Sequence, residues 1–448
     1  MEAAAGRLFS KQDLKRLIIP LVLEQLLAVT IGMADTVMVS SAGEAAVSGV
    51  SLVDTINILL INIFSALATG GAVVASQYLG RREEENACVS AQQLVTAITL
   101  LALGVMGVSL VAKDWLLRLI FGGIEAEVMR NAQIYFLLWA LSYPFLAIYN
   151  AGAALFRSMG NSKISLETSV VMNLINVVGN AITIYGFHMG VFGAALATLI
   201  SRMAGAVAML ALLRNRANPI HIISYRRLSL RFDMIKRILR VGVPNGLENG
   251  MFQFGKILVQ GLIATFGTSA IAANAVGNSV AGIAIIPGSA IGLAMITIVG
   301  RCVGAQDYDQ ARYYTKLLMK LTYGSMLLLN LAEMAACRWI VSCFHLSPEA
   351  SSIAFEILIA HSLCCIFFWP MSFTLPNALR AAGDARFTMI CSVASMWICR
   401  VIMSYVLAQG LNMGVMGVWI AMFMDWVVRA VIFLIRFRGS RWTQKKII

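Results

Sequence analysis

Charged side chains within long apolar runs are the residues of this sequence best placed to do chemistry. A charge near the centre of a bilayer costs about 2.5–3.5 kcal/mol, so each one is expected to serve an ion, a proton or a buried partner. The charged residues selected from these runs are seven acids and two cations: Glu24, Asp35, Asp54, Glu167, Glu248, Glu356, Asp425, Lys256 and Arg400.

A stripe of polar side chains lies within one of these runs, residues 164–185. The stripe consists of Asn173, Asn176, Asn180 and Thr183. Spacings of three and four residues place these side chains on one face of a helix, and Thr198 of the next run is expected to turn toward the same space. Such a stripe forms either interhelical hydrogen bonds or an oxygen-rich wall for a cation. Asp35 either faces this wall or lies at the outer membrane interface.

Motifs for catalysis and for nucleotide or metal binding are absent from the sequence. There is no P-loop, no HExxH and no zinc-ligand spacing, and the four histidines are scattered. The eight cysteines contain no CxxC pair and are interpreted as apolar packing residues. We therefore expect no enzyme activity, no cofactor and no ATP-driven transport.

The elements that hold these residues are apolar helices. Of the 448 residues, 59% are apolar and 13% are charged, against about one quarter charged in soluble proteins, so the chain is predicted to be an all-α polytopic membrane protein. Breaks at charged or Gly/Pro-rich segments give twelve spans: 16–39, 48–77, 88–111, 131–155, 164–185, 191–213, 240–265, 272–299, 317–336, 352–378, 387–408 and 414–435.

Charge between the spans predicts the orientation. Of 35 Lys and Arg residues, 27 fall on the side of the two termini and three on the opposite side. Basic loops are retained in the cytoplasm, so both termini are expected there, in the cell membrane. The basic residues are distributed as membrane topology requires, so the net positive charge does not indicate nucleic-acid binding. We expect lipids but no nucleic acid as partners.

The two halves of the chain repeat each other. An offset of half the chain length places Pro20 on Pro244 and Glu24 on Glu248, and it recurs near the end of each half. We predict a six-helix lobe over 1–213, a basic linker over 214–239 and a second six-helix lobe over 240–448. Two parallel lobes that rock around a central cavity favour a secondary transporter.

Prolines and charges suggest further roles. Pro20 either ends a cytoplasmic turn or is a bend point that moves during transport. Glu248, Lys256 and Arg400 either form a structural network or take part in the function. Glu24, Asn150 and Asn173 are further candidates for substrate binding or a charge network.

The order and spacing of several motifs resemble the multidrug and toxic compound extrusion (MATE) family over nearly the whole chain. These motifs are Pro20-Leu-Val-Leu-Glu-Gln, Ala34-Asp35-Thr-Val-Met-Val, Gln77-Tyr-Leu-Gly, Arg157-Ser-Met-Gly-Asn, Gly193-Ala-Ala-Leu-Ala-Thr198, Gly242-Val-Pro and Arg380-Ala-Ala-Gly-Asp. The resemblance implies an antiporter that exports organic, often cationic, compounds in exchange for Na⁺ or H⁺.

The resemblance also implies a site for the coupling cation. Its matching positions are Asp35, Asn176, Asn180, the carbonyl of Ala194, and Thr198. Some members carry a second aspartate where this chain has Asn180, so the site here holds one formal charge, which one Na⁺ or one proton would neutralise. The bending proline of the family corresponds to Pro20.

We therefore expect an alternating-access antiporter for organic cations or amphiphiles, working as a monomer. The alternative is a flippase for a lipid-linked precursor, which would need a strongly cationic cavity. An integral-membrane enzyme or a channel is less consistent with the polar residues and the duplication.

Overall fold

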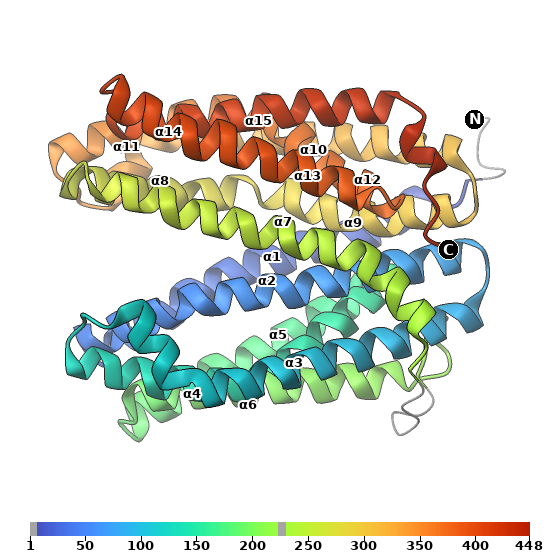
Figure 1. The fold of residues 1–448 in the computed structure, drawn as a ribbon, viewed down its shortest axis with the longest axis horizontal. Coiled ribbons are helices and arrows are strands. Elements are labelled where there is room, and N and C mark those ends of the chain that lie inside the picture. Colours follow the sequence, from blue (N-terminus) through green and yellow to red (C-terminus); the bar gives the residue numbers. More distant parts are fainter. Residues whose placement is uncertain (1–6, 223–229) are drawn as a thin grey trace. The chain divides into compact units, whose positions relative to one another are not determined.

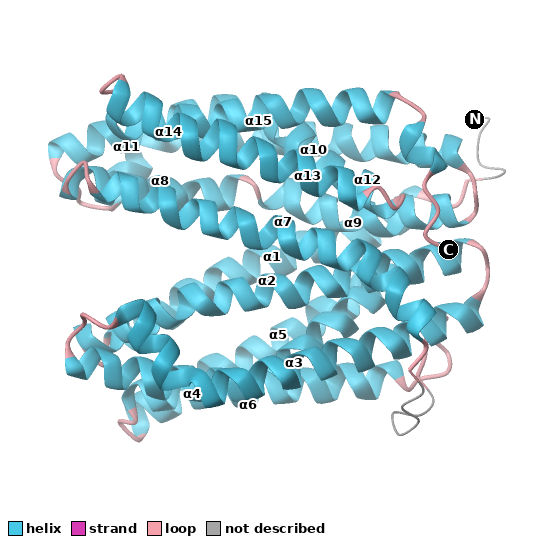
Figure 2. Cartoon of the chain, viewed as in Figure 1, coloured by secondary structure: helices cyan, strands magenta, loops and turns pink. Residues whose placement is uncertain are grey.

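The protein is helical throughout its described part. A computed structural model describes residues 7–222 and 230–448, and within these ranges the chain forms helices joined by short loops, with no strand (Figure 1 and Figure 2). In a bilayer, helices satisfy every backbone polar group within one segment. The predicted fold class is confirmed.

Helices of the first half correspond closely to the predicted spans. They are α1 (Lys11–Ser40), α2 (Glu44–Gly80), α3 (Glu84–Phe121), α4 (Ala126–Ser158), α5 (Ser162–Asn180), the π-helix η1 (Ala181–Gly186) and α6 (Gly190–Leu213).

Helices of the second half are more often interrupted. They are α7 (Phe232–Ala264), α8 (Thr268–Ala284), α9 (Ile286–Gly304), α10 (Tyr308–Cys343), α11 (Pro348–Trp369), η2 (Pro370–Thr374), α12 (Leu375–Ala381), α13 (Ala385–Ser395), η3 (Met396–Ile402), α14 (Met403–Tyr405), η4 (Val406–Gly410), α15 (Gly414–Arg438) and η5 (Arg441–Gln444).

Eleven helical segments of the described part are long and apolar enough to cross a membrane. The predicted span 240–265 lies in α7 but falls outside this set, because polar residues such as Asn245, Glu248 and Lys256 interrupt its apolar sequence. The predicted span 272–299 is broken into α8 and α9 just before Pro287. Proline lacks the N–H group that would continue the α8 hydrogen bonds.

The described residues form two compact units, residues 11–222 with 230–246, and residues 247–448 with 7–10. The division between them falls inside α7, a few residues after the predicted start of the second lobe at 240. The start of the described chain belongs to the second unit because the backbone N–H of Phe9 donates to Tyr314 at 3.0 Å and the Tyr314 hydroxyl donates back at 2.8 Å.

The internal repeat is visible in the backbone conformation. Positive φ angles place residues in a left-handed region that is costly for most side chains. They occur in pairs separated by half the chain length: Gly43 and Gly267 (105° and 95°), Arg82 and Gln306 (62° and 58°), His188 and Asn412 (53° and 55°), and Gly190 and Gly414 (56° and 58°). The duplication therefore preserves how the helices end and restart.

One structural difference between the repeats explains a shift in their alignment. The offset is shorter by one between Gly160 and Gly383, which both have positive φ, and it returns to half the chain length at Gly190 and Gly414. The π-helix η3 lies between these points in the second repeat, whereas η1 of the first repeat corresponds to η4. A π-turn accommodates one extra residue within a helix. We therefore place the inserted residue in η3.

In the first unit, small residues let helices approach closely. A Cβ atom on Gly49 of α2 would lie 2.9 Å from Asn131 Cβ of α4. On α6, a Cβ atom at Gly193 would lie 2.8 Å from Thr183, and one at Gly205 would lie 2.7 Å from Met172. The small face of α6 thus packs against α5 and η1 and fixes the polar stripe beside α6.

Candidate functional site

A chain of hydrogen bonds joins three helices of the first unit. Asn180 Nδ2 donates to Asp35 Oδ1 at 2.9 Å and lies 3.4 Å from Asn176 Oδ1. Asn176 Nδ2 donates to Thr198 Oγ1 at 3.1 Å, and the Thr198 hydroxyl donates to the Ala194 carbonyl at 3.0 Å. The structure thus brings together the five residues predicted for the cation site, from α1, α5 and α6.

Helix geometry positions these atoms. Asn176 and Asn180 are one turn apart on α5, as are Ala194 and Thr198 on α6. Asn176 and Asn180 are buried, whereas Asp35 and Thr198 are partly buried. The contact with Asn180 shows that Asp35 faces the stripe.

The site is rich in oxygen atoms, and one of them is unused. Asn180 Oδ1 is buried and accepts no hydrogen bond from the described residues. A buried polar atom without a partner is costly and usually signals a ligand or a functional role. Carboxylate, amide, hydroxyl and carbonyl oxygens are the ligands that hard cations prefer. This donor set fits Na⁺, and the single carboxylate fits one positive charge.

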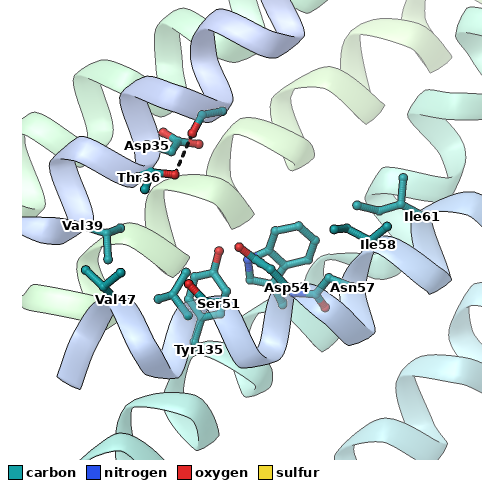
Figure 3. Close-up of a pocket in the computed structure, with 13 residues that line it drawn as sticks. Asp35, Thr36, Val39, Val47, Ser51, Asp54, Asn57, Ile58, Ile61 and Tyr135 are labelled. Atoms are coloured by element: carbon teal, nitrogen blue, oxygen red, sulfur yellow. Dashed lines mark hydrogen bonds between the residues drawn. The ribbon is translucent and has the colours of Figure 1, made fainter. Parts of the chain in front are cut away.

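A cavity of about 260 Å³ adjoins Asp35 in the same unit. Its polar lining includes Asp35 of α1, Ser51, Asp54 and Asn57 of α2, and Tyr135 of α4, whose side chains surround one space in Figure 3. Asn57 Nδ2 donates to Asp54 Oδ1 at 3.3 Å. Two carboxylates from neighbouring helices therefore face one pocket with aromatic walls.

Arg202 of α6 is a residue beside this pocket that the sequence analysis did not select. Its guanidinium carbon lies 3.5 Å from the centre of the Trp139 ring, and its Nη1 donates to Ser142 Oγ at 2.6 Å. Asp35 and Asp54 both lie within its electrostatic range. The pocket therefore has one cation for two carboxylates. An arginine within the apolar run 191–213 was the available signal.

Pro20 lies inside α1 rather than at the end of a turn, so that alternative is wrong. Proline removes one helical hydrogen bond and leaves the carbonyl four residues earlier without its partner. That carbonyl belongs to Arg16, and the Ser162 hydroxyl of α5 lies 3.2 Å from it and 2.5 Å from the Leu17 carbonyl. The geometry is compatible with a bend point, and the hinge role stays a prediction.

The remaining candidates of the first unit lie apart from the hydrogen-bonded chain. The Ser165 hydroxyl lies 3.0 Å from both carboxylate oxygens of Glu24 and donates one hydrogen bond to this carboxylate, and Glu24 Oε1 lies 3.9 Å from Arg157 Nη1. Asn173 Nδ2 donates to Ser169 at 3.2 Å. Asn150 Nδ2 is buried and has no hydrogen-bond partner among the described residues.

The predicted cluster of Glu248, Lys256 and Arg400 is wrong in its pairing. Glu248 forms a 2.6 Å ion pair with Arg380, the repeat equivalent of the Glu24 and Arg157 pair. Lys256 and Arg400 instead contact the Phe252 ring. The sequence repeat showed that the glutamate and the arginine occur in both halves of the chain. The spacing along the sequence did not show that the two side chains form an ion pair.

Comparison with known proteins gives consistent matches over the whole chain. The family model described as MatE matches residues 20–182 and 244–406, two segments whose starts are separated by half the chain length. The uncharacterized transporter YisQ of Bacillus subtilis is 26% identical over 433 residues, which cover 95% of this chain and 94% of that protein. The probable multidrug resistance protein NorM of Thermotoga maritima is 24% identical, with 98% and 94% covered.

A solved structure has the same fold. It is described as an outward-facing conformation of a multidrug resistance MATE family transporter, and it matches with a TM-score of 0.89 at 21% identity. The match covers 96% of this chain and 95% of that one. The helical order is therefore shared along almost the entire length.

Proposed function

The chain belongs to the MatE family of transporters, and on that premise we propose that it exports organic cations across the cell membrane in exchange for Na⁺ or H⁺. The family and its multidrug relatives support efflux rather than the flippase alternative. The observation that carries the proposal is the hydrogen-bonded chain from Asp35 to the Ala194 carbonyl, with the unused oxygen of Asn180.

In this proposal, Asp35 binds the coupling cation. Na⁺ would draw on oxygens of Asp35, Asn176, Asn180, Ala194 and Thr198, whereas a proton would neutralise Asp35 alone. In either case the local charge changes by one unit, and the hydrogen bond between Asn180 and Asp35 must adjust. Because Asp35 is on α1, this change acts on the helix that contains Pro20.

The neighbouring pocket is proposed to bind the organic cation. Asp54 supplies a negative charge, and Tyr135 and Trp139 supply aromatic walls, which attract cations through their ring faces. Asp35 lines this pocket as well, so both ligands depend on one carboxylate. Exchange follows if coupling cation and substrate stabilise different conformations of the transporter.

The test is efflux of ethidium from proteoliposomes, driven separately by a Na⁺ gradient and by a pH gradient. The parent should respond to one of them, which identifies the coupling ion, and Asp35→Asn should abolish the response. If Na⁺ is the ion, Thr198→Val should raise the Na⁺ concentration for half-maximal efflux about tenfold, because an oxygen ligand worth about 1.4 kcal/mol is lost.

Thr99→Val is the matched control. The Thr99 hydroxyl on α3 donates to the Val95 carbonyl at 2.6 Å, outside the pocket, so this variant should keep the parent response. Normal coupled efflux by Asp35→Asn would contradict the proposed site. No ethidium efflux under either gradient would contradict the proposed substrate class and revive the flippase alternative.

Two further parts of the proposal concern topology and partners. The concentration of 27 basic residues on one side supports cytoplasmic termini, which fluorescent fusions at each end can test. One chain contains all residues proposed for both ligands, so a monomer in lipid suffices for the exchange.

A further inference from the structure

Three cationic side chains surround one phenyl ring in the second unit. Lys256 Nζ lies 5.3 Å from the centre of the Phe252 ring, and the guanidinium carbons of Arg400 and Arg429 lie 5.1 Å and 5.5 Å from it. Phe252 and Lys256 come from α7, Arg400 from η3 and Arg429 from α15. We call Lys256, Arg400 and Arg429 around Phe252 the basic cluster.

The protein supplies too little negative charge for the basic cluster. Arg429 Nε donates to Asp425 Oδ1 at 2.8 Å. Lys256 and Arg400 form no ion pair with any acid in residues 7–222 or 230–448, and Arg400 Nε is buried without a hydrogen-bond partner there. Positive charges therefore exceed negative ones by two, in a place where uncompensated charge is expensive.

Other acids of this unit are engaged or face outward. Glu248 pairs with Arg380, and Asp384 pairs with Arg436. Glu333 accepts a hydrogen bond from Ser362, and Glu356 is exposed. Arg400 interacts electrostatically with Asp425, Arg429 and Lys256, of which Asp425 alone is an acid. An external anion is therefore the natural partner of the cluster.

The repeat gives an independent comparison. At the offset of half the chain length, Val259 and Met422 correspond to Asp35 and Thr198, and Asn176 corresponds to Cys399 or Arg400 of η3, where the inserted residue lies. The second repeat thus has apolar side chains where the first has the carboxylate and the hydroxyl of the cation site, and it has a guanidinium within one residue of the position of the Asn176 amide. The polarity of the equivalent region is reversed.

The groups around the basic cluster suit a flat, anionic ligand. A guanidinium forms paired hydrogen bonds with a planar carboxylate. Trp397 and Trp426 have buried Nε1 donors without hydrogen-bond partners in the described chain. Lys256 is exposed and Phe252 is partly buried, whereas Arg400 is 8% exposed. The ammonium of Lys256 is therefore the most accessible of these groups.

We propose that the basic cluster binds the carboxylate of an aromatic compound. This binding site goes beyond the cation exchange proposed above and does not depend on which ion drives it. The ligand is recognised by one negative charge, which Lys256 and Arg400 attract, and by a flat apolar body, which packs against the aromatic side chains.

Equilibrium binding to the intact chain in phosphatidylcholine nanodiscs tests this proposal without transport. The probes are 2-naphthoate and its neutral analogue 2-naphthalenemethanol. We expect naphthoate to bind at least tenfold more tightly than the alcohol. Lys256→Gln and Arg400→Gln should each weaken naphthoate binding about tenfold, equivalent to about 1.4 kcal/mol, and leave the alcohol unchanged. Arg400→Lys should recover part of the loss.

Arg338→Gln is the control, because Arg338 is an exposed cation of the same unit that lies 5.8 Å from the Phe355 ring, outside the cluster. It should bind naphthoate as the parent does. Lys256 is exposed, so its variant remains informative if Arg400→Gln fails to fold. Equal affinities for the two probes, or equal losses in Arg338→Gln, would overturn the proposal. Tighter binding of dihexanoyl phosphatidate than of naphthoate would also overturn it, in favour of a lipid phosphate.

Discussion

Removal of Arg380 should destabilise the protein much more than removal of Arg157, although the two residues occupy equivalent positions in the repeats. Arg380 lies 2.6 Å from Glu248, with 11% and 9% of their side chains exposed. Arg157 lies 3.9 Å from Glu24, with 18% and 13% exposed. The same ion pair is therefore tight and buried in one unit and looser in the other.

The expected magnitudes follow from what each glutamate keeps. Glu248 Oε2 has no hydrogen-bond partner among the described residues, and Oε1 accepts from Arg380. Arg380→Met leaves a buried carboxylate uncompensated, which costs about 3–5 kcal/mol. Glu24 keeps the hydrogen bond from the Ser165 hydroxyl, and its ion pair is longer and more exposed, so Arg157→Met should cost about 1 kcal/mol.

The assay is the free energy of unfolding in mixed micelles, from SDS titrations followed by tryptophan fluorescence. Combining Glu248→Gln with Arg380→Met should recover at least half of the loss seen with Arg380→Met alone, because the uncompensated charge is removed. Equal losses for Arg380→Met and Arg157→Met, or no recovery in the double variant, would refute the reasoning from burial and distance.

Three other perturbations test the first unit. Pro20→Ala should fold normally and slow efflux in proteoliposomes. Ser162→Ala removes the hydroxyl that lies beside the Arg16 and Leu17 carbonyls, and it should lower the free energy of unfolding by about 1 kcal/mol. Gly104→Ala should stabilise α3 by about 0.5–1 kcal/mol in the SDS titration, because nothing lies within 4 Å of the added Cβ atom. Gly49→Ala should destabilise the protein, because its Cβ atom would lie 2.9 Å from Asn131 Cβ of α4. Asp54→Asn should raise the ethidium concentration for half-maximal efflux about tenfold and leave the response to the driving ion intact.

Most of the fold was predictable because the bilayer leaves the backbone few options. Runs of apolar residues that must satisfy their own N–H and C=O groups become helices, so span positions follow from hydropathy. The break before Pro287 was also predictable, because proline has no N–H group to continue the hydrogen bonds of the preceding helix. The π-turns were not, because η1 and η3 depend on local packing that leaves no signal in composition.

The candidate site was predictable where periodicity and family resemblance acted together. Asn176 and Asn180 share a face by their spacing, and Thr198 and Asp35 were already candidates beside that face. The resemblance added the Ala194 carbonyl and assigned all five residues to one site. Arg202 was overlooked, although an arginine within an apolar run is a signal by itself. Ion-pair partners were not predictable, because spacing along one chain does not give distances between helices.

Duplication constrains turn positions and helix positions differently, and this difference bears on the proposed cation site and on the proposed anion-binding cluster. Turn positions such as Gly43 and Gly267 keep the same backbone angles in both repeats, because few residues tolerate positive φ. Asn176 and Arg400 occupy helix positions that any side chain tolerates, so their polarity was free to diverge. The first unit now presents more carboxylates than cations beside its pocket, and the second presents three cations to one carboxylate around Phe252. A substitution that changes the charge of the binding-site side chains in one unit should therefore leave ligand binding in the other unit intact. The backbone conformation that both units share does not specify the charge of either site.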